Sequence, residues 1–127
     1  MTRQHSGVCA PIRGAGIGLR TPHFSALQQD RPAIPWLEVP IDNYMIAGGQ
    51  ALQHLERIRR DYPITFHGVG MSLGSVDPLN QNYLRRLRQL MRRFQPAWLS
   101  DHLCWTSVDG RYLHELLPLP YVDEAIA

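Results

Sequence analysis

Short apolar runs alternate with amphipathic segments along most of the chain. The apolar runs cover residues 14–20, 36–39, 63–68 and 97–100, and glycine or proline punctuates each of them. Short and nearly continuous apolar runs are typical of strands that are buried on both faces of a parallel sheet. We therefore predict four parallel strands that are separated by helices and loops.

Two of the intervening segments have helical periodicity. Residues 51–62 place apolar side chains at helical spacing. In the second segment Asp77 is the expected N-cap, Pro78 is the expected first helical residue, and Pro96 ends the helix. The apolar face of this second helix consists of Tyr83, Leu84, Leu87, Leu90, Met91 and Phe94.

Two other segments lack such periodicity. Residues 21–35 combine polar side chains with three prolines, which predicts a loop after the first strand. After the fourth strand, the Asp109-Gly110 pair predicts the turn of a hairpin-like insertion. An amphipathic segment then begins at Tyr121.

Four strands that alternate with helices predict an α/β fold with a parallel sheet. A doubly wound sheet would normally carry a Gly-x-Gly-x-x-Gly turn after its first strand, whereas the glycines at positions 14, 16 and 18 have a different spacing and lie within the strand. We therefore predict the first four β/α units of a TIM-type (β/α)8 barrel over residues 14–127, preceded by a loose leader at residues 1–13. Four strands cannot close a barrel, so we expect a fragment, or a chain that pairs with another copy of itself or with a missing half.

The composition is typical of one globular domain, with 127 residues of which 44% are hydrophobic and 19% charged. No run approaches the roughly 20 apolar residues that cross a bilayer, and we identify no secretory signal. Cys9 and Cys104 are interpreted as free thiols in a reducing cytoplasm. All 13 basic residues are arginine and the net charge is +2, so we interpret the helical arginines as a solvated surface and expect no nucleic-acid partner.

Reactive side chains of a barrel of β/α units lie at the carboxyl ends of its strands. His67 ends the third apolar run, and His102 follows the fourth. Neighbouring strand ends would direct both imidazoles at one ion, for which iron, zinc, copper and nickel are suitable. Asp101 is then a hydrogen-bond acceptor behind a ligand or a further ligand. From position alone, a hydrogen-bonded core or loop histidine is the more common interpretation of each residue.

Other polar residues near the predicted strand ends are open to two interpretations. Glu38, within the second strand, is either a functional carboxylate or a group that pairs with an arginine or the backbone beside a helix. Asp42 and Asn43 form either part of a site or a turn with a helix cap. His23 lies in the loop after the first strand. We assign no reaction to the remaining candidates, which are His5, His54, Ser72, Cys104, His114 and Glu115.

Four motifs, one for each predicted strand, resemble those of a known family. The first two are Gly18-Leu19-Arg20-x-x-His23 and Glu38-Val39-x-x-Asp42-Asn43-Tyr44-Met45. The third is His67-Gly68-Val69-Gly70-Met71-Ser72-Leu73-Gly74-Ser75. The fourth is Ser100-Asp101-His102-Leu103-Cys104-Trp105, followed by Leu116-Leu117-Pro118-Leu119-Pro120-Tyr121. The chain thus resembles the N-terminal half of the multinuclear non-haem iron-dependent oxidative enzymes, a family of methanobactin-maturation iron enzyme-like barrels that was long catalogued as uncharacterised.

The resemblance implies a complete TIM barrel of about twice this length, with two or three irons at the carboxyl-terminal face. It also implies an oxidoreductase that uses dioxygen to modify cysteine residues in a ribosomally made peptide, often with a partner protein that presents the peptide. The matching site positions are His67 and His102 as iron ligands, Asp101 and Glu38 as acidic residues, and His23 and Asn43 as neighbours of the site.

The chain departs from the family pattern in two positions and in length. Asp42 stands where the family usually has the longer glutamate, and Pro40 stands where a polar residue is commoner. The resemblance places the remaining ligands on strands five to eight, which this chain lacks. Three alternatives therefore stay open: another metal-dependent barrel of the isomerase or endonuclease type, a peptide-binding module, or an inactive truncated product.

Overall fold

The computed structural model describes residues 12–46 and 48–125. Its main sheet has four parallel strands that lie side by side in their order along the chain. These strands are β1 (Ile17–Gly18), β2 (Leu37–Pro40), β3 (Ile64–Gly68) and β4 (Leu99–Asp101). The predicted α/β class and its parallel sheet are confirmed.

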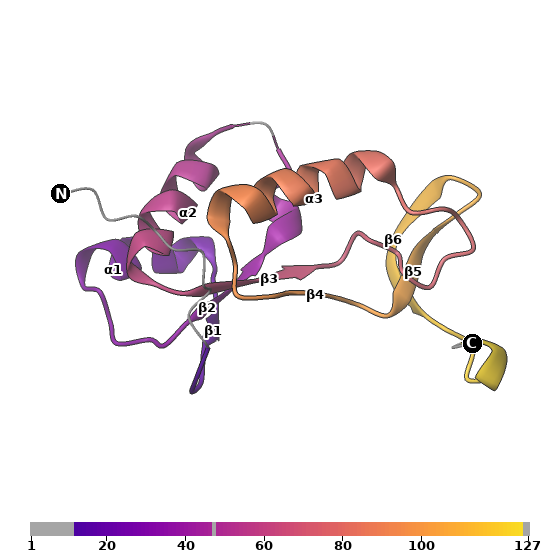
Figure 1. Ribbon diagram of the computed structural model, residues 1–127, viewed down its shortest axis with the longest axis horizontal. Helices are drawn as coiled ribbons and strands as arrows, with labels where there is room; N and C mark the ends of the chain where they lie inside the picture. Colours follow the sequence, from indigo (N-terminus) through magenta and orange to yellow (C-terminus); the bar gives the residue numbers. More distant parts are fainter. Residues whose placement is uncertain (1–11, 47, 126–127) are drawn as a thin grey trace.

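The helices lie together on one side of this sheet (Figure 1). They are α1 (Phe24–Gln29), α2 (Gln50–Asp61) and α3 (Gln81–Phe94), and the short 3-10 turns η1 (Thr21–His23) and η2 (Ile41–Tyr44) follow β1 and β2. A doubly wound sheet would carry helices on both faces, so the one-sided arrangement is consistent with half of a TIM-type barrel. Among the described residues, both β1 and β4 have a free edge.

Alternation along β2 and β3 decides which side chains enter the core. Leu37 and Val39 of β2 and Phe66 of β3 are fully buried among the apolar residues of the helices. The ring of Phe66 meets that of Phe94 from α3 edge to face, with centroids 6.3 Å apart. The opposite side of the sheet, which no helix covers, is called the open face below. By strand register it carries Trp36, Glu38, Thr65, His67, Trp98 and Ser100.

The prediction of a loop over residues 21–35 is partly wrong, because its first half forms η1 and α1. α1 has only six residues, so it is too short to show a helical period, and it is stabilised by packing through buried Leu27. His54 of α2, to which we assigned no reaction, lies half-buried against α1. Its Nδ1 is 3.0 Å from Gln28 Nε2, and its ring centroid is 5.3 Å from that of Phe24.

α3 begins at Gln81, three residues later than predicted, and Asp77 is not its cap. The side-chain oxygen of Asn80 accepts hydrogen bonds of 3.0 and 3.1 Å from two backbone N–H groups in the first turn. Asp77 instead accepts from the backbone N–H groups of Asp109 and Gly110, at 3.1 and 3.2 Å. Asp and Asn are both favourable caps, so only the contact with the distant turn decides between them.

The predicted insertion after β4 is an antiparallel hairpin of β5 (Cys104–Val108) and β6 (Arg111–Pro118). It lies beyond the carboxyl ends of the sheet strands (Figure 1). The loop after β3 holds the β5 side of the hairpin, because the Gly74 N–H donates to the Cys104 carbonyl at 2.7 Å and Ser72 Oγ accepts from the Thr106 N–H at 2.8 Å. The final short turn is η3 (Asp123–Ala125).

Some predictions fall outside the described residues. Most of the predicted leader at residues 1–13 lies there, as does Cys9, while Cys104 is a buried free thiol whose pKa is raised by burial. Within residues 12–46 and 48–125, no helix has both the length and the apolar character that a membrane span needs.

We expect Asn80→Ala to lower the free energy of unfolding by about 1 kcal/mol, because two N–H groups in the first turn of α3 lose their acceptor. Urea denaturation followed by circular dichroism measures the change. Gln89→Ala, at an exposed position of the same helix, is the control and should leave stability nearly unchanged. Equal losses in both variants would contradict the assignment of Asn80 as the cap.

Candidate metal centre

The carboxyl ends of β3 and β4 bring two histidine rings together on the open face. His67 pairs with Ser100 in the strand register, and His102 lies two residues beyond Ser100, so alternation directs both rings to the same side. Their Nε2 atoms are 3.0 Å apart and their ring centroids 4.8 Å apart. The structure therefore places the two predicted ligands next to each other, and their role as ligands stays a prediction.

Ser100 orients the ring of His67. Its Oγ lies 2.8 Å from His67 Nδ1 and 3.5 Å from the carbonyl oxygen of Phe66. A hydroxyl that donates to this carbonyl accepts from Nδ1–H, which leaves an unprotonated Nε2 that faces His102 Nε2 at the hydrogen-bond distance of 3.0 Å. That tautomer is the one that a metal ion requires at Nε2.

The spacing of the two rings fits a shared metal ion. Two imidazole nitrogens with metal bonds of about 2.1 Å lie about 3 Å apart when the bonds meet at roughly 90°. The observed Nε2 separation is 3.0 Å, and Ser100 supplies the hydrogen bond behind His67 that metal-binding histidines usually have. Within the described ranges, however, no group of three or more His, Cys, Asp and Glu side chains is arranged to hold an ion. The pair fits as two ligands of a larger set.

Asp101 lies beside the histidine pair but is turned away from the two rings. Its Oδ1 accepts from the backbone N–H of His102 at 2.7 Å, and its Oδ2 accepts from that of Met71 at 3.4 Å. Burial raises the pKa of this carboxyl, and the two backbone hydrogen bonds oppose the rise without cancelling it. Asp101 therefore binds backbone N–H groups, including that of His102, and makes no hydrogen bond to either ring among the described residues.

Glu38 projects from the middle of β2 onto the open face, because its neighbours Leu37 and Val39 face the helices. Glu38 therefore lies on the face opposite the helices, and no ion pair joins it to an arginine among the described residues. The next open-face residue of β2 is Pro40, which stands opposite His67 in the register. Proline brings no ligand atom to that position, so the departure from the family pattern leaves an apolar neighbour beside the ring.

His23 and Asn43 belong to the connections after β1 and β2, whereas the histidine pair lies at the ends of β3 and β4. His23 ends η1, and its Nδ1 is buried without a hydrogen-bond partner among the described residues. Asn43 is an exposed residue of η2 that lines a separate pocket with Thr21 and His54, between the β1 and β2 connections. The structure does not bring either residue into contact with the two rings, and their place in the site stays a prediction.

Sequence reasoning missed the roles of Ser100 and Asp42. Ser100 is two residues before His102, and period-two alternation in a strand was the signal that could have placed both on one face. Asp42 was open to interpretation as a turn residue, whereas its Oδ2 accepts from the Val69 N–H at 2.9 Å and its Oδ1 from the Tyr83 hydroxyl at 3.0 Å. The contact with Tyr83 depends on how α3 packs against the sheet, so the sequence alone does not predict it.

A family profile described as the RiPP precursor modification enzyme MbnB/TglH/ChrH matches residues 14–127. The chain belongs to this family. RiPP denotes a ribosomally made peptide that is modified after translation. The motif resemblance to this family is thereby confirmed.

Curated relatives carry the family name UPF0276. Those of Acaryochloris marina and Anaeromyxobacter sp. are 55% and 50% identical to the chain, each over 115 residues that make up 91% of it. That of Caulobacter vibrioides is 48% identical over 118 residues, or 92% of the chain. The alignments cover only 41% or 42% of the relatives, so the chain spans about two fifths of their length.

We expect Ser100→Ala to weaken metal binding by about 10- to 100-fold, because His67 loses the partner that fixes its tautomer and ring orientation. Competition with a chromophoric chelator measures the affinity. Ser100→Thr keeps the hydroxyl and should restore most of it, while Ser25→Ala, on the exposed side of α1, is the control. Wild-type affinity in Ser100→Ala would show that His67 does not depend on this hydrogen bond.

Proposed function

We propose that the protein carrying this chain is an iron- and dioxygen-dependent oxidoreductase that modifies cysteine residues of a ribosomally made precursor peptide. The observation that carries the proposal is the convergence of His67 and His102 at the carboxyl end of a β/α sheet. Imidazole nitrogens suit iron, and the family description supplies the class of substrate.

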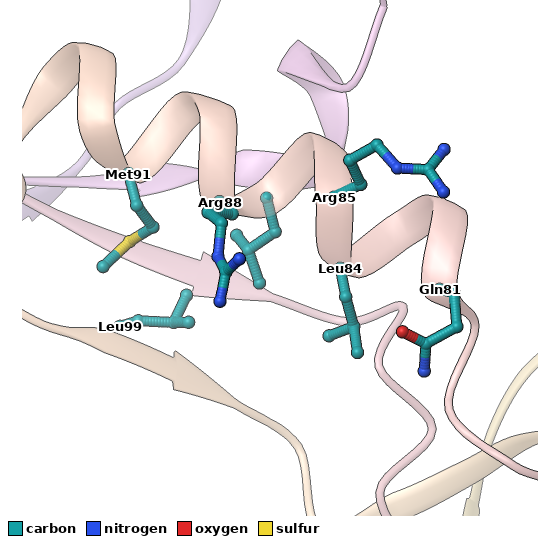
Figure 2. Close-up of a pocket in the computed structure, with 7 residues that line it drawn as sticks. Gln81, Leu84, Arg85, Arg88, Met91 and Leu99 are labelled. Carbon is teal, nitrogen blue, oxygen red and sulfur yellow. The ribbon is translucent and has the colours of Figure 1, made fainter.

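We also infer that the sheet is half of a closed (β/α)8 barrel. β4 has a neighbouring strand on one side only, and a groove of about 530 Å³ runs between it and α3. Figure 2 shows Leu84 and Met91 of α3 facing Leu99 of β4 across this groove. The groove is lined by Leu84, Leu87, Met91 and Leu99 together with Gln81, Arg85 and Arg88. A groove at a sheet edge with this apolar share is the place for the helix of the next β/α unit, and the extra length of the relatives is enough to supply it.

The described residues have distinct tasks in this proposal. His67 and His102 would hold the ion through Nε2, and Ser100 keeps His67 in the tautomer that leaves Nε2 free. Glu38 adds an acidic group to the same open face. When bound, iron would supply the one-electron chemistry with dioxygen that oxidises the cysteine of the peptide.

The open face also offers an apolar base for the site. Trp36 and Trp98 immediately precede β2 and β4, and their ring centroids are 5.9 Å apart in an edge-to-face arrangement. Trp98 is 49% exposed in this chain, and closure of a barrel would bury it. Exclusion of water from that interior would strengthen the electrostatic interactions around the two rings.

The substrate partner in this proposal is a cysteine-containing precursor peptide, which would enter from the carboxyl-terminal side of the sheet. The β5–β6 hairpin stands at that side, and β5 begins two residues after His102. A second protein that presents the peptide remains a further part of the proposal. Its binding surface would then adjoin the hairpin.

We expect His67→Ala and His102→Ala each to remove most of the iron from the full-length protein and to abolish dioxygen consumption with the peptide, because each variant loses one of the two paired nitrogens. Iron is measured by elemental analysis after anaerobic purification. His114→Ala, at an exposed position of β6, is the control and should retain iron.

Full iron occupancy in both site variants would contradict the ligand assignment. Zinc or manganese in place of iron in the wild-type protein would instead support another metal-dependent barrel enzyme. Iron binding without turnover of any precursor peptide would support a peptide-binding role.

A further inference from the structure

Three side chains from three different elements meet at the carboxyl end of β3. They are Asp42 of η2, Tyr83 of α3 and Asp101 of β4, and together they are called the carboxylate–tyrosine cluster. The Tyr83 hydroxyl donates to Asp42 Oδ1 at 3.0 Å. Among the described residues, no hydrogen bond joins any of these three side chains to the ring of His67 or His102. The side chains of the cluster are therefore distinct from the two candidate ligand rings.

The cluster binds the backbone that continues from both histidines. Asp42 Oδ2 accepts from the N–H of Val69, two residues after His67, at 2.9 Å. Asp101 Oδ2 accepts from the N–H of Met71 at 3.4 Å, and its Oδ1 accepts from the N–H of His102 itself at 2.7 Å. Each ring is therefore attached to a backbone segment that one of the two carboxylates holds.

Two glycines, the last residue of β3 and one in the loop after it, let this backbone approach the cluster closely. A Cβ at Gly68 would lie 2.6 Å from Asp101 Oδ2 and 3.1 Å from the Tyr83 hydroxyl oxygen. A Cβ at Gly70 would lie 2.6 Å from the Tyr83 ring and 2.7 Å from Asp42 Oδ1. Any larger residue at either position would force the loop or the cluster to move, so the loop has little freedom to shift.

The hydrogen bond between Tyr83 and Asp42 joins a phenol on α3 to a carboxyl group on η2. Burial, followed by the nearby charge of Asp42, raises the pKa of the Tyr83 phenol well above its usual value. The phenol therefore remains a donor at every physiological pH, and the carboxyl group of Asp42 accepts from it and from the Val69 N–H together.

We propose that Asp42 and Tyr83 are positioning residues for the His67–His102 pair, which α3 thereby holds at ligand spacing. The inference rests on the proposed metal-binding function. Ligand side chains must stay within about 0.5 Å of their productive geometry, and a loop that is released from Asp42 would move the ring of His67 relative to that of His102. Neither residue is assigned a contact with substrate or metal.

The simpler interpretation is that Tyr83 only stabilises the packing of α3. Tyr62 offers a control, because it is a buried tyrosine whose hydroxyl donates to the Pro32 carbonyl at 2.9 Å, whereas Tyr83 is partly buried and bonds Asp42. Tyr62 lies just before β3, at the opposite end of the strand from His67. A purely structural role predicts the same behaviour for Tyr83→Phe and Tyr62→Phe.

The test uses the full-length protein with Co²⁺ as the spectroscopic probe. We expect Tyr83→Phe and Asp42→Asn each to weaken Co²⁺ binding about tenfold and to change the ligand-field spectrum, as loss of a residue that orients a ligand does. We expect Tyr62→Phe to keep the wild-type affinity and spectrum even if its unfolding temperature falls as much as that of Tyr83→Phe. Thermal unfolding of the metal-free variants reports the structural effect separately.

Two results would overturn the inference in different ways. Wild-type affinity and spectrum in both Tyr83→Phe and Asp42→Asn, with metal still bound through His67 and His102, would overturn the positioning role alone. A wild-type protein whose Co²⁺ binding is unaffected by His67→Ala and His102→Ala would overturn the metal site, and the positioning role with it.

Discussion

The parallel pairing of β3 with β4 sets the relation between the hydrophobic core and the candidate metal centre. With Phe66 opposite Leu99 and His67 opposite Ser100, apolar and polar residues alternate in phase on the two strands. Phe66 turns to the helices, and His67 turns to the open face beside His102. A register shift of one residue would send the side chains of β4 to the wrong faces, so the pair of rings exists only in this register.

The apolar side of the sheet is what fixes that register. Burial of an aromatic side chain such as Phe66 contributes about 1.5–3 kcal/mol, whereas a partly exposed contact between two imidazoles contributes less. The core therefore decides the pairing, and the polar residues of the open face follow from it. This is why Glu38, with Leu37 and Val39 buried on either side, cannot turn to the helices.

The loop after β3 connects parts of the molecule that are distant in sequence. Its first residues lie against the carboxylate–tyrosine cluster, and Ser72 and Gly74 then hold β5. Asp77 closes the segment by accepting from the hairpin turn. The histidine pair, α3 and the hairpin are therefore all joined to one short segment of the chain.

The sequence by itself determined the four strands, the two longer helices and the hairpin turn, because each has a periodicity or a glycine or proline boundary that acts locally. It also placed His67 and His102 at neighbouring strand ends. Only the tertiary structure decided that Asn80 and not Asp77 caps α3, that Asp101 binds backbone, and that Asp42 meets Tyr83. These outcomes depend on hydrogen bonds between residues that are about 30 to 40 positions apart, and no local pattern encodes which distant donor a carboxylate will find.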